Sequence, residues 1–201
     1  MKIENLFSLN DLVGKDMEKL LIIGAGGFGR IVLEHARQEY ECSFIDDGVS
    51  VGTEICGCKV IGATNDLQNL FSDYKKAVVA IGNNILREKL YQEAKKIGFN
   101  IPNIICSSVY CSPYSKIGEG CVFLNNVVVQ NGSFIGNGVI LNPGVEIHHD
   151  CKVGNFVLIY ANSVIRALAE IGDRAWIGSN LSVSNGMKVC EDTIIENGKT
   201  I

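Results

Sequence analysis

The chain has 201 residues, 47% of them hydrophobic and 20% charged, and a formal net charge of −4. This is an ordinary globular composition, and the lack of any basic run argues against a nucleic-acid partner or an anionic membrane surface. No apolar stretch approaches the roughly 20 residues of a membrane span, and the first residues lack the pattern of a secretory signal. We therefore expect a cytoplasmic protein with no membrane span.

Eight cysteines are present, and their spacing argues against a metal site or a disulfide framework. Only Cys56 and Cys58 are close together, as C-x-C, and no second pair follows that would complete a zinc site. We expect reduced cysteines that are mostly buried as small hydrophobic residues.

Residues 1–18 match neither of the two patterns that follow, and we expect an N-terminal extension outside both domains, with an added helix from "SLNDLVGKDMEKL". Residues 19–104 predict a small Rossmann-like nucleotide-binding domain. Its first segment is an apolar run, a glycine turn and a helical pattern, in which Gly24, Gly26 and Gly29 match G-x-G-x-x-G. Bare backbone in such a turn lets a phosphate approach the N-terminus of the helix.

Two further strands are expected in this domain. The strand "CSFIDD" ends in Asp46 and Asp47, where a dinucleotide fold places an acid near a ribose. The strand "KAVVAIGNN" ends in Gly82 and Asn83. A full dinucleotide-binding domain has two such halves and this chain has one, so a mononucleotide or a nucleotide-sugar diphosphate fits better than NAD. The alternative is a loop that binds nothing.

The second half of the chain is a repeat. The segments "KIGEGCVF", "FIGNGVIL", "KVGNFVLI" and "EIGDRAWI" begin at residues 116, 134, 152 and 170, and every sixth residue from Ile117 to Ile201 is apolar. A six-residue period is typical of a parallel β-helix, with the apolar series pointing inward, and we assign it to residues 105–201. We also expect the repeated glycines to stack at one corner with positive φ; these are Gly118, Gly136, Gly154 and Gly172.

Five motifs carry a resemblance to a known family: "IGAGGFGR", "FIDD", "AIGNNILREKLYQEAKKIGF", "ILNPGVEIHHDCKVG" and "AWIG". The chain resembles bacterial sugar acetyltransferases of the sialic-acid O-acetyltransferase type, and best matches the N-acetyltransferases that act on UDP-4-amino-4,6-dideoxy sugars in glycan synthesis. The resemblance implies a left-handed β-helix, a homotrimer, a nucleotide sugar bound at the N-terminal domain, and acetyl-CoA bound between neighbouring β-helices. No metal is implied.

The adjacent residues His148, His149 and Asp150 are the candidate catalytic centre. In the frame that the resemblance supplies, His149 is the general base and Asp150 its orienter, because a carboxylate that holds one ring nitrogen leaves the other free to take a proton. His148 falls at a variable position and is expected to be solvated. A zinc site of three histidines is disfavoured, because His35 belongs to a helix of the other domain.

The resemblance also assigns the binding residues. Those expected to contact the nucleotide sugar are Gly26, Gly27, Phe28, Asp46, Asp47, Gly82 and Asn83. Those expected to contact acetyl-CoA are Ala167, whose N–H would face the thioester oxygen, and Gly178.

These features together predict an acetyl-CoA-dependent N-acetyltransferase acting on a nucleotide-linked amino sugar, with UDP as the expected nucleotide. One alternative is O-acetylation of a sialic acid or a similar sugar. Another is a sugar-nucleotide-binding protein with little activity, which the sequence favours by stopping at "IIENGKTI", where the family adds a partial coil and a tail.

Overall fold

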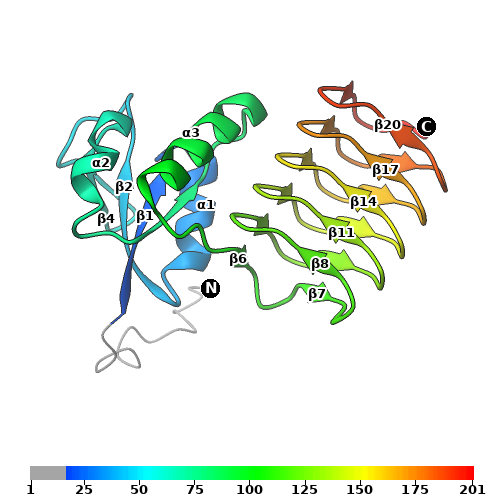
Figure 1. Cartoon of the computed structure of the whole chain (residues 1–201), viewed down its shortest axis with the longest axis horizontal. Coiled ribbons are helices and arrows are strands. Elements are labelled where there is room, and N and C mark those ends of the chain that lie inside the picture. The colour runs from blue at the N-terminus through cyan, green and yellow to red at the C-terminus, as the bar shows by residue number, and fades with distance from the viewer. Residues whose placement is uncertain (1–16) are drawn as a thin grey trace, which may run out of the picture.

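The computed structural model describes residues 17–201, which form an α/β unit joined to a parallel β-helix (Figure 1). The α/β unit has a five-stranded sheet in the order β3-β4-β2-β1-β5, parallel except for the β3–β4 pair. The strands are β1 (Glu18–Ile23), β2 (Tyr40–Ile45), β3 (Glu54–Ile55), β4 (Cys58–Gly62) and β5 (Lys76–Val79). The helices are α1 (Gly27–Ala36), the 3-10 turn η2 (Thr64–Asp66), α2 (Leu67–Leu70) and α3 (Asn84–Ile97).

The three strands expected in this unit, β1, β2 and β5, are present, and two further strands, β3 and β4, were not expected. Strand β4 pairs in parallel with β2 and carries β3 as an antiparallel edge. Most of the helix expected at the N-terminus lies outside the described residues, but its last three residues, 18–20, belong to strand β1 and not to a helix.

The β-helix is a triangular prism of two-residue strands stacked at an interval of 18 residues. Face 1 contains β6 (Ile104–Ile105), β9 (Val122–Phe123), β12 (Ile140–Leu141), β15 (Leu158–Ile159), β18 (Trp176–Ile177) and β21 (Ile194–Ile195). Face 2 contains β7 (Tyr110–Cys111), β10 (Val128–Val129), β13 (Glu146–Ile147), β16 (Val164–Ile165) and β19 (Ser182–Val183). Face 3 contains β8 (Lys116–Ile117), β11 (Phe134–Ile135), β14 (Lys152–Val153), β17 (Glu170–Ile171) and β20 (Lys188–Val189).

The apolar six-residue series forms the interior of this prism, as the period predicted. Its members from Phe123 to Ile195 are buried in one continuous cluster, and Ile117 and Ile201 pack against the two ends. Such short strands gain their burial only from the coils above and below, so the array is stable as a stack.

The glycine prediction is half wrong. Gly118, Gly136, Gly154 and Gly172 do stack on one another, but none of the four glycines has a positive φ. Glycine is required there because successive coils approach too closely for a side chain: a Cβ on Gly136 would lie 2.7 Å from the carbonyl of Gly154. The left-handed position comes two residues later, for example at Gly138 and Phe156.

The α/β unit covers one side of the prism. The outward residues of the first coils of face 1, Val122, Ile140 and Leu158, are at most 3% exposed and belong to the same apolar cluster as Val32 and Leu33 of α1. Helix α3 lies along the corner between faces 3 and 1, where the Tyr91 and Phe156 rings meet edge to face with centroids 5.2 Å apart. The two parts therefore form a continuous apolar contact.

Candidate active site

His149 and Asp150 lie at the corner between faces 2 and 3, in the turn that joins β13 to β14. The Nδ1 atom of His149 is 2.8 Å from the Oδ2 atom of Asp150, and both side chains are more than half exposed. Asp150 has a φ of 59°, a left-handed conformation that aspartate tolerates better than most residues. The carboxylate thus holds one ring nitrogen and leaves Nε2 directed away from it, as a general base requires.

The preceding coil fixes this turn through residues that no sequence motif singled out. The Gln130 side-chain oxygen accepts a hydrogen bond from the His149 N–H at 3.1 Å. The Ser133 hydroxyl donates to the His148 carbonyl at 2.7 Å and accepts from the Cys151 N–H at 3.2 Å. Gly132 leaves the space that the Asp150 carboxylate fills, because a Cβ on this glycine would overlap Oδ1. In the sequence, Gly132 and Ser133 could have been found by the period of the repeat, because they precede Asp150 and Cys151 by 18 residues.

His148 points elsewhere. Its Nε2 atom is 3.6 Å from an oxygen of Glu146 on face 2, and the ring is less exposed than that of His149. It therefore has a partner of its own outside the His149–Asp150 pair.

The structure brings one of the two predicted acetyl-CoA residues next to His149. Ala167 follows His149 by 18 residues and stacks one coil further along, where the adjacent Leu168 N–H donates to the His149 carbonyl at 3.2 Å. Within residues 17–201 the Ala167 N–H has no hydrogen-bond acceptor.

Gly178 lies at a different corner, between faces 1 and 2. Its N–H donates to the Ile195 carbonyl and its carbonyl accepts from the Ser163 hydroxyl. Glycine is needed at this position because Asn197 in the next coil occupies the space of a Cβ. The structure does not bring Gly178 to His149.

The glycine loop joins β1 to α1. Gly24 has a φ of +108° and Gly29 lies against the Gly24 carbonyl, so both are required by the tight turn and by close helix–strand packing. At Gly26 a Cβ would meet nothing within 4 Å, and at Gly27 only an Arg30 nitrogen at 3.8 Å. These two glycines face the open space in which a phosphate would lie. The partly buried Phe28 side chain packs against the apolar cluster that α1 shares with the β-helix.

The two acids after β2 support the neighbouring loops. Asp46 accepts the N–H of Ala25 in the glycine loop at 2.7 Å and that of Gly48 at 2.8 Å. Asp47 accepts both the N–H and the hydroxyl of Thr64, at 2.8 and 2.9 Å. Both acids therefore lie at the carboxyl edge of the sheet, where ligands of open α/β sheets bind.

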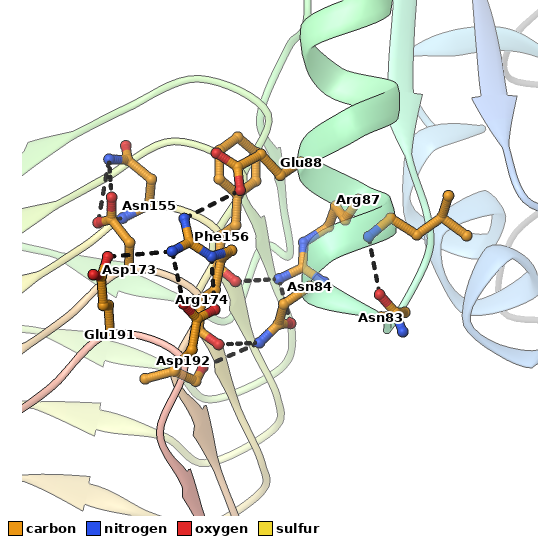
Figure 2. Close-up of polar contacts among 12 residues, drawn as sticks. Asn83, Asn84, Arg87, Glu88, Asn155, Phe156, Asp173, Arg174, Glu191 and Asp192 are labelled. Carbon is orange, nitrogen blue, oxygen red and sulfur yellow. Dashed lines mark hydrogen bonds and ion pairs between the residues drawn. The ribbon is translucent and has the colours of Figure 1, made fainter.

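Gly82 and Asn83 form the turn between β5 and α3, at the same edge of the sheet. A Cβ on Gly82 would meet nothing within 4 Å. Asn83 is the N-cap of α3, and its Oδ1 atom accepts the Leu86 N–H at 2.9 Å. Figure 2 shows that the next residues, Asn84 and Arg87, reach from this turn to the β-helix.

Within one chain, the glycine loop and the His149–Asp150 pair lie on opposite sides of the prism. The glycine loop precedes α1, which packs against face 1, whereas His149 is on the corner between faces 2 and 3. That corner is the one opposite face 1 in a three-sided prism. In one chain the residues expected to bind the nucleotide sugar are therefore separated from the His149–Asp150 pair by the β-helix.

All eight cysteines are free thiols, and six of them are buried or pack against buried clusters: Cys42, Cys58, Cys106, Cys111, Cys121 and Cys151. Burial raises the pKa of the Cys121 thiol to about 12 and that of Cys106 to about 11. No group of three or more His, Cys, Asp or Glu side chains within residues 17–201 could hold a metal ion, and no helix in this part of the chain is long and apolar enough to span a membrane.

Comparison with known proteins decides the family. The family pattern described as PglD N-terminal domain matches residues 19–94, and that of the bacterial transferase hexapeptide (six repeats) matches residues 132–167. The acetyltransferase domain of PglB from Neisseria gonorrhoeae is 33% identical with a TM-score of 0.87, over 92% of this chain and 91% of that one. The chain belongs to the hexapeptide-repeat sugar acetyltransferases.

Two other members of this family support the assignment. GDP-perosamine N-acetyltransferase from Escherichia coli O157:H7 is 26% identical over 83% of this chain and 78% of that protein. Perosamine N-acetyltransferase from Caulobacter crescentus, a histidine variant solved with CoA and GDP-perosamine, is 29% identical with a TM-score of 0.86, over 91% of this chain and 88% of that one. The PglB domain has also been solved with acetyl-CoA. This chain is therefore an acetyltransferase with acetyl-CoA as its co-substrate.

Proposed function

We propose that this protein transfers the acetyl group of acetyl-CoA to the amino group of a nucleotide-linked 4-amino-4,6-dideoxy sugar, with His149 as general base. The observation that carries the proposal is the His149–Asp150 contact of 2.8 Å beside the free N–H of Ala167. A base and an oxyanion donor on adjacent coils are the two groups that acyl transfer to an amine needs.

In the proposed reaction the sugar amine attacks the thioester carbon while His149 Nε2 accepts its proton. Asp150 stabilises the imidazolium that forms, because its carboxylate already holds Nδ1. The Ala167 N–H donates to the oxyanion of the tetrahedral intermediate. When the carbon–sulfur bond breaks, the imidazolium returns a proton to the departing thiolate. No covalent enzyme intermediate is required.

We further propose that the site is shared between chains of a homotrimer. The separation of His149 from its own glycine loop by the β-helix supports this assembly, because a sugar bound at that loop needs a base from a neighbouring chain. The exposed position of the catalytic pair also supports it, since a general base acts in a site from which water is largely excluded. Acetyl-CoA then lies between neighbouring β-helices. The cytoplasmic location expected from the sequence stays a prediction.

The nucleotide sugar is proposed to bind with its diphosphate at Gly26 and Gly27, its nucleoside near Asp46 and Asp47, and its sugar near the turn at Gly82. The openness of these glycines and the position of both acids at the carboxyl edge of the sheet support this placement. The sequence resemblance favours UDP, whereas two relatives act on or bind GDP-perosamine.

The test is thiol release from acetyl-CoA with a panel of UDP-, dTDP-, GDP- and CMP-linked sugars that carry either an amino or a hydroxyl group. Mass spectrometry of the product identifies the acetylated atom. Transfer to an amino sugar that depends on His149 supports the proposal. Transfer to a hydroxyl group identifies an O-acetyltransferase, and tight sugar-nucleotide binding without thiol release identifies a binding protein.

A further inference from the structure

Arg87 on helix α3 is the largest side chain that is almost completely buried, with 1% exposure. Among residues 17–201 no carboxylate pairs with it, although a buried charge is normally paired with one. The charge is instead surrounded by oxygen dipoles. Burial lowers the pKa of its guanidinium to about 10, which still leaves it charged at neutral pH. Nothing in the proposed reaction uses this residue.

The guanidinium connects two parts of the protein (Figure 2). Toward the α/β unit, Nη1 donates to the carbonyls of Ile81 and Gly82, at 2.9 and 3.3 Å. Toward the β-helix, Nε donates to the Gly138 carbonyl at 2.9 Å and Nη2 to the Phe156 carbonyl at 2.7 Å. One planar group therefore holds the turn after β5 and the corner of the β-helix together.

The two β-helix acceptors define one coil. Gly138 and Phe156 are 18 residues apart, which is one full turn of the prism, and His149 lies between them. Arg87 thus bonds to the same position in two successive coils, at the two ends of the turn of chain that carries the proposed base. The same α3 N-terminus reaches the following coil, where the Asn84 side chain donates to the carbonyls of Arg174 and Ala175 at 2.8 and 3.2 Å.

A second interaction at this corner is a partly buried ion-pair network. Arg174 pairs with Glu88 of α3 at 3.2 Å and with Glu191 and Asp192 in the next coil. These contacts join side chains, whereas the planar guanidinium of Arg87 has its donors fixed in a fork and bonds to backbone carbonyls, apart from the Asn84 Oδ1 atom at 2.8 Å.

We propose that Arg87 is a positioning residue that fixes the sugar-binding turn at Gly82 relative to the coil carrying His149. In the proposed homotrimer, every α/β unit is fixed to its own β-helix, and this docking helps to place the unit relative to a neighbour's base. A displaced turn would therefore displace the amine from the base at every site. This inference rests on the proposed function.

The test compares Arg87→Met and Arg87→Lys with Lys95→Met. Lys95 is on the same helix and pairs with Glu119 at the same corner, at 2.7 Å, but the pair is exposed and does not involve the turn. We expect Arg87→Met to lower kcat by roughly 10²-fold, the effect of a misplacement of about 1 Å, with a smaller change in the KM for acetyl-CoA. Arg87→Lys should retain more activity than Arg87→Met, since it keeps the charge, and Lys95→Met should behave like wild type.

Two readouts separate positioning from simple stabilisation. Rates are measured well below the unfolding temperature and normalised to folded protein, so a variant that is only less stable keeps its kcat. Amide hydrogen exchange of residues 80–86 should be faster in Arg87→Met and unchanged in Lys95→Met. A wild-type kcat in folded Arg87→Met, or unchanged exchange in that segment, would overturn the inference. If Arg87→Met does not fold, Arg87→Lys decides by the same two measurements.

The failure of the proposed function gives a different result. In that case wild-type protein releases no thiol with any nucleotide sugar, and the kcat values of the Arg87 variants can no longer be compared. The exchange measurement still shows whether Arg87 holds the turn, because it needs no substrate.

Discussion

Gly132→Ala should disable the candidate base without touching it. A Cβ at Gly132 would overlap the Oδ1 atom of Asp150, and ordinary contact requires a separation of about 3.5 Å, so the carboxylate must retreat by about 1 Å. Its two oxygens move together. The 2.8 Å contact between Oδ2 and His149 Nδ1 then opens beyond hydrogen-bond range.

The expected loss of activity follows from that displacement. A misplacement of about 1 Å in a catalytic group costs roughly 10²-fold in rate, which corresponds to about 2.7 kcal/mol in the barrier. The substitution should also lower the free energy of unfolding by about 1–2 kcal/mol, because Gly132 has a φ of +73°. Affinity for the nucleotide sugar should be nearly unchanged, since the glycine loop is not involved.

The assay is thiol release under saturating substrates, with thermal unfolding and nucleotide-sugar calorimetry on the same samples. Gly198→Ala is the matched control: its φ is +71° and a Cβ there would meet nothing within 4 Å. It should lose similar stability and keep its kcat. In an Asp150→Asn background, Gly132→Ala should cost less than in wild type because both act on one contact. A folded Gly132→Ala protein with wild-type kcat would refute the role given to Asp150.

Three further predictions test other parts of the site. His149→Ala should lower kcat by roughly 10²–10⁴-fold, the usual contribution of a positioned base, and His148→Ala should do far less; the opposite order in steady-state kinetics would shift the catalytic frame by one residue. Asp46→Ala should weaken nucleotide-sugar binding in calorimetry more than it lowers kcat, because it removes the carboxylate that holds the glycine loop. In native protein a thiol reagent followed by mass spectrometry should label the exposed Cys56 and Cys190 before the buried cysteines, and equal labelling of all eight would contradict the packing described.

The sequence alone was sufficient for those features that repeat or lie close together in the chain. The interior of the β-helix could be predicted because each coil places the same residue type at the same step, so a six-residue period identifies the buried series. The glycine loop could be predicted because its three glycines, its strand and its helix are contiguous. The contact of His149 with Asp150 joins neighbours in the sequence.

Features that depend on how distant segments pack were decided only by the tertiary structure. The periodicity marks glycines at one corner, but only the separation of successive coils shows that Gly136 is required for close approach and not for its φ. Strand β4 carries no strong pattern of its own and is defined by its pairing with β2. A glycine is needed at position 132 because the Asp150 side chain, one coil later, occupies the space of a Cβ.

The placement of the two domains is the clearest case. In the sequence Arg87 is one charged residue on an amphipathic helix, which usually means an exposed side chain. In the structure it is buried because α3 packs along a corner of the prism, where backbone carbonyls of successive coils can surround a guanidinium. That docking puts the glycine loop beside face 1 and leaves His149 on the opposite corner. Local sequence patterns determine the fold of each domain. The relative placement of the glycine loop and His149 is determined by contacts between the domains, and the residues that make these contacts follow no common period.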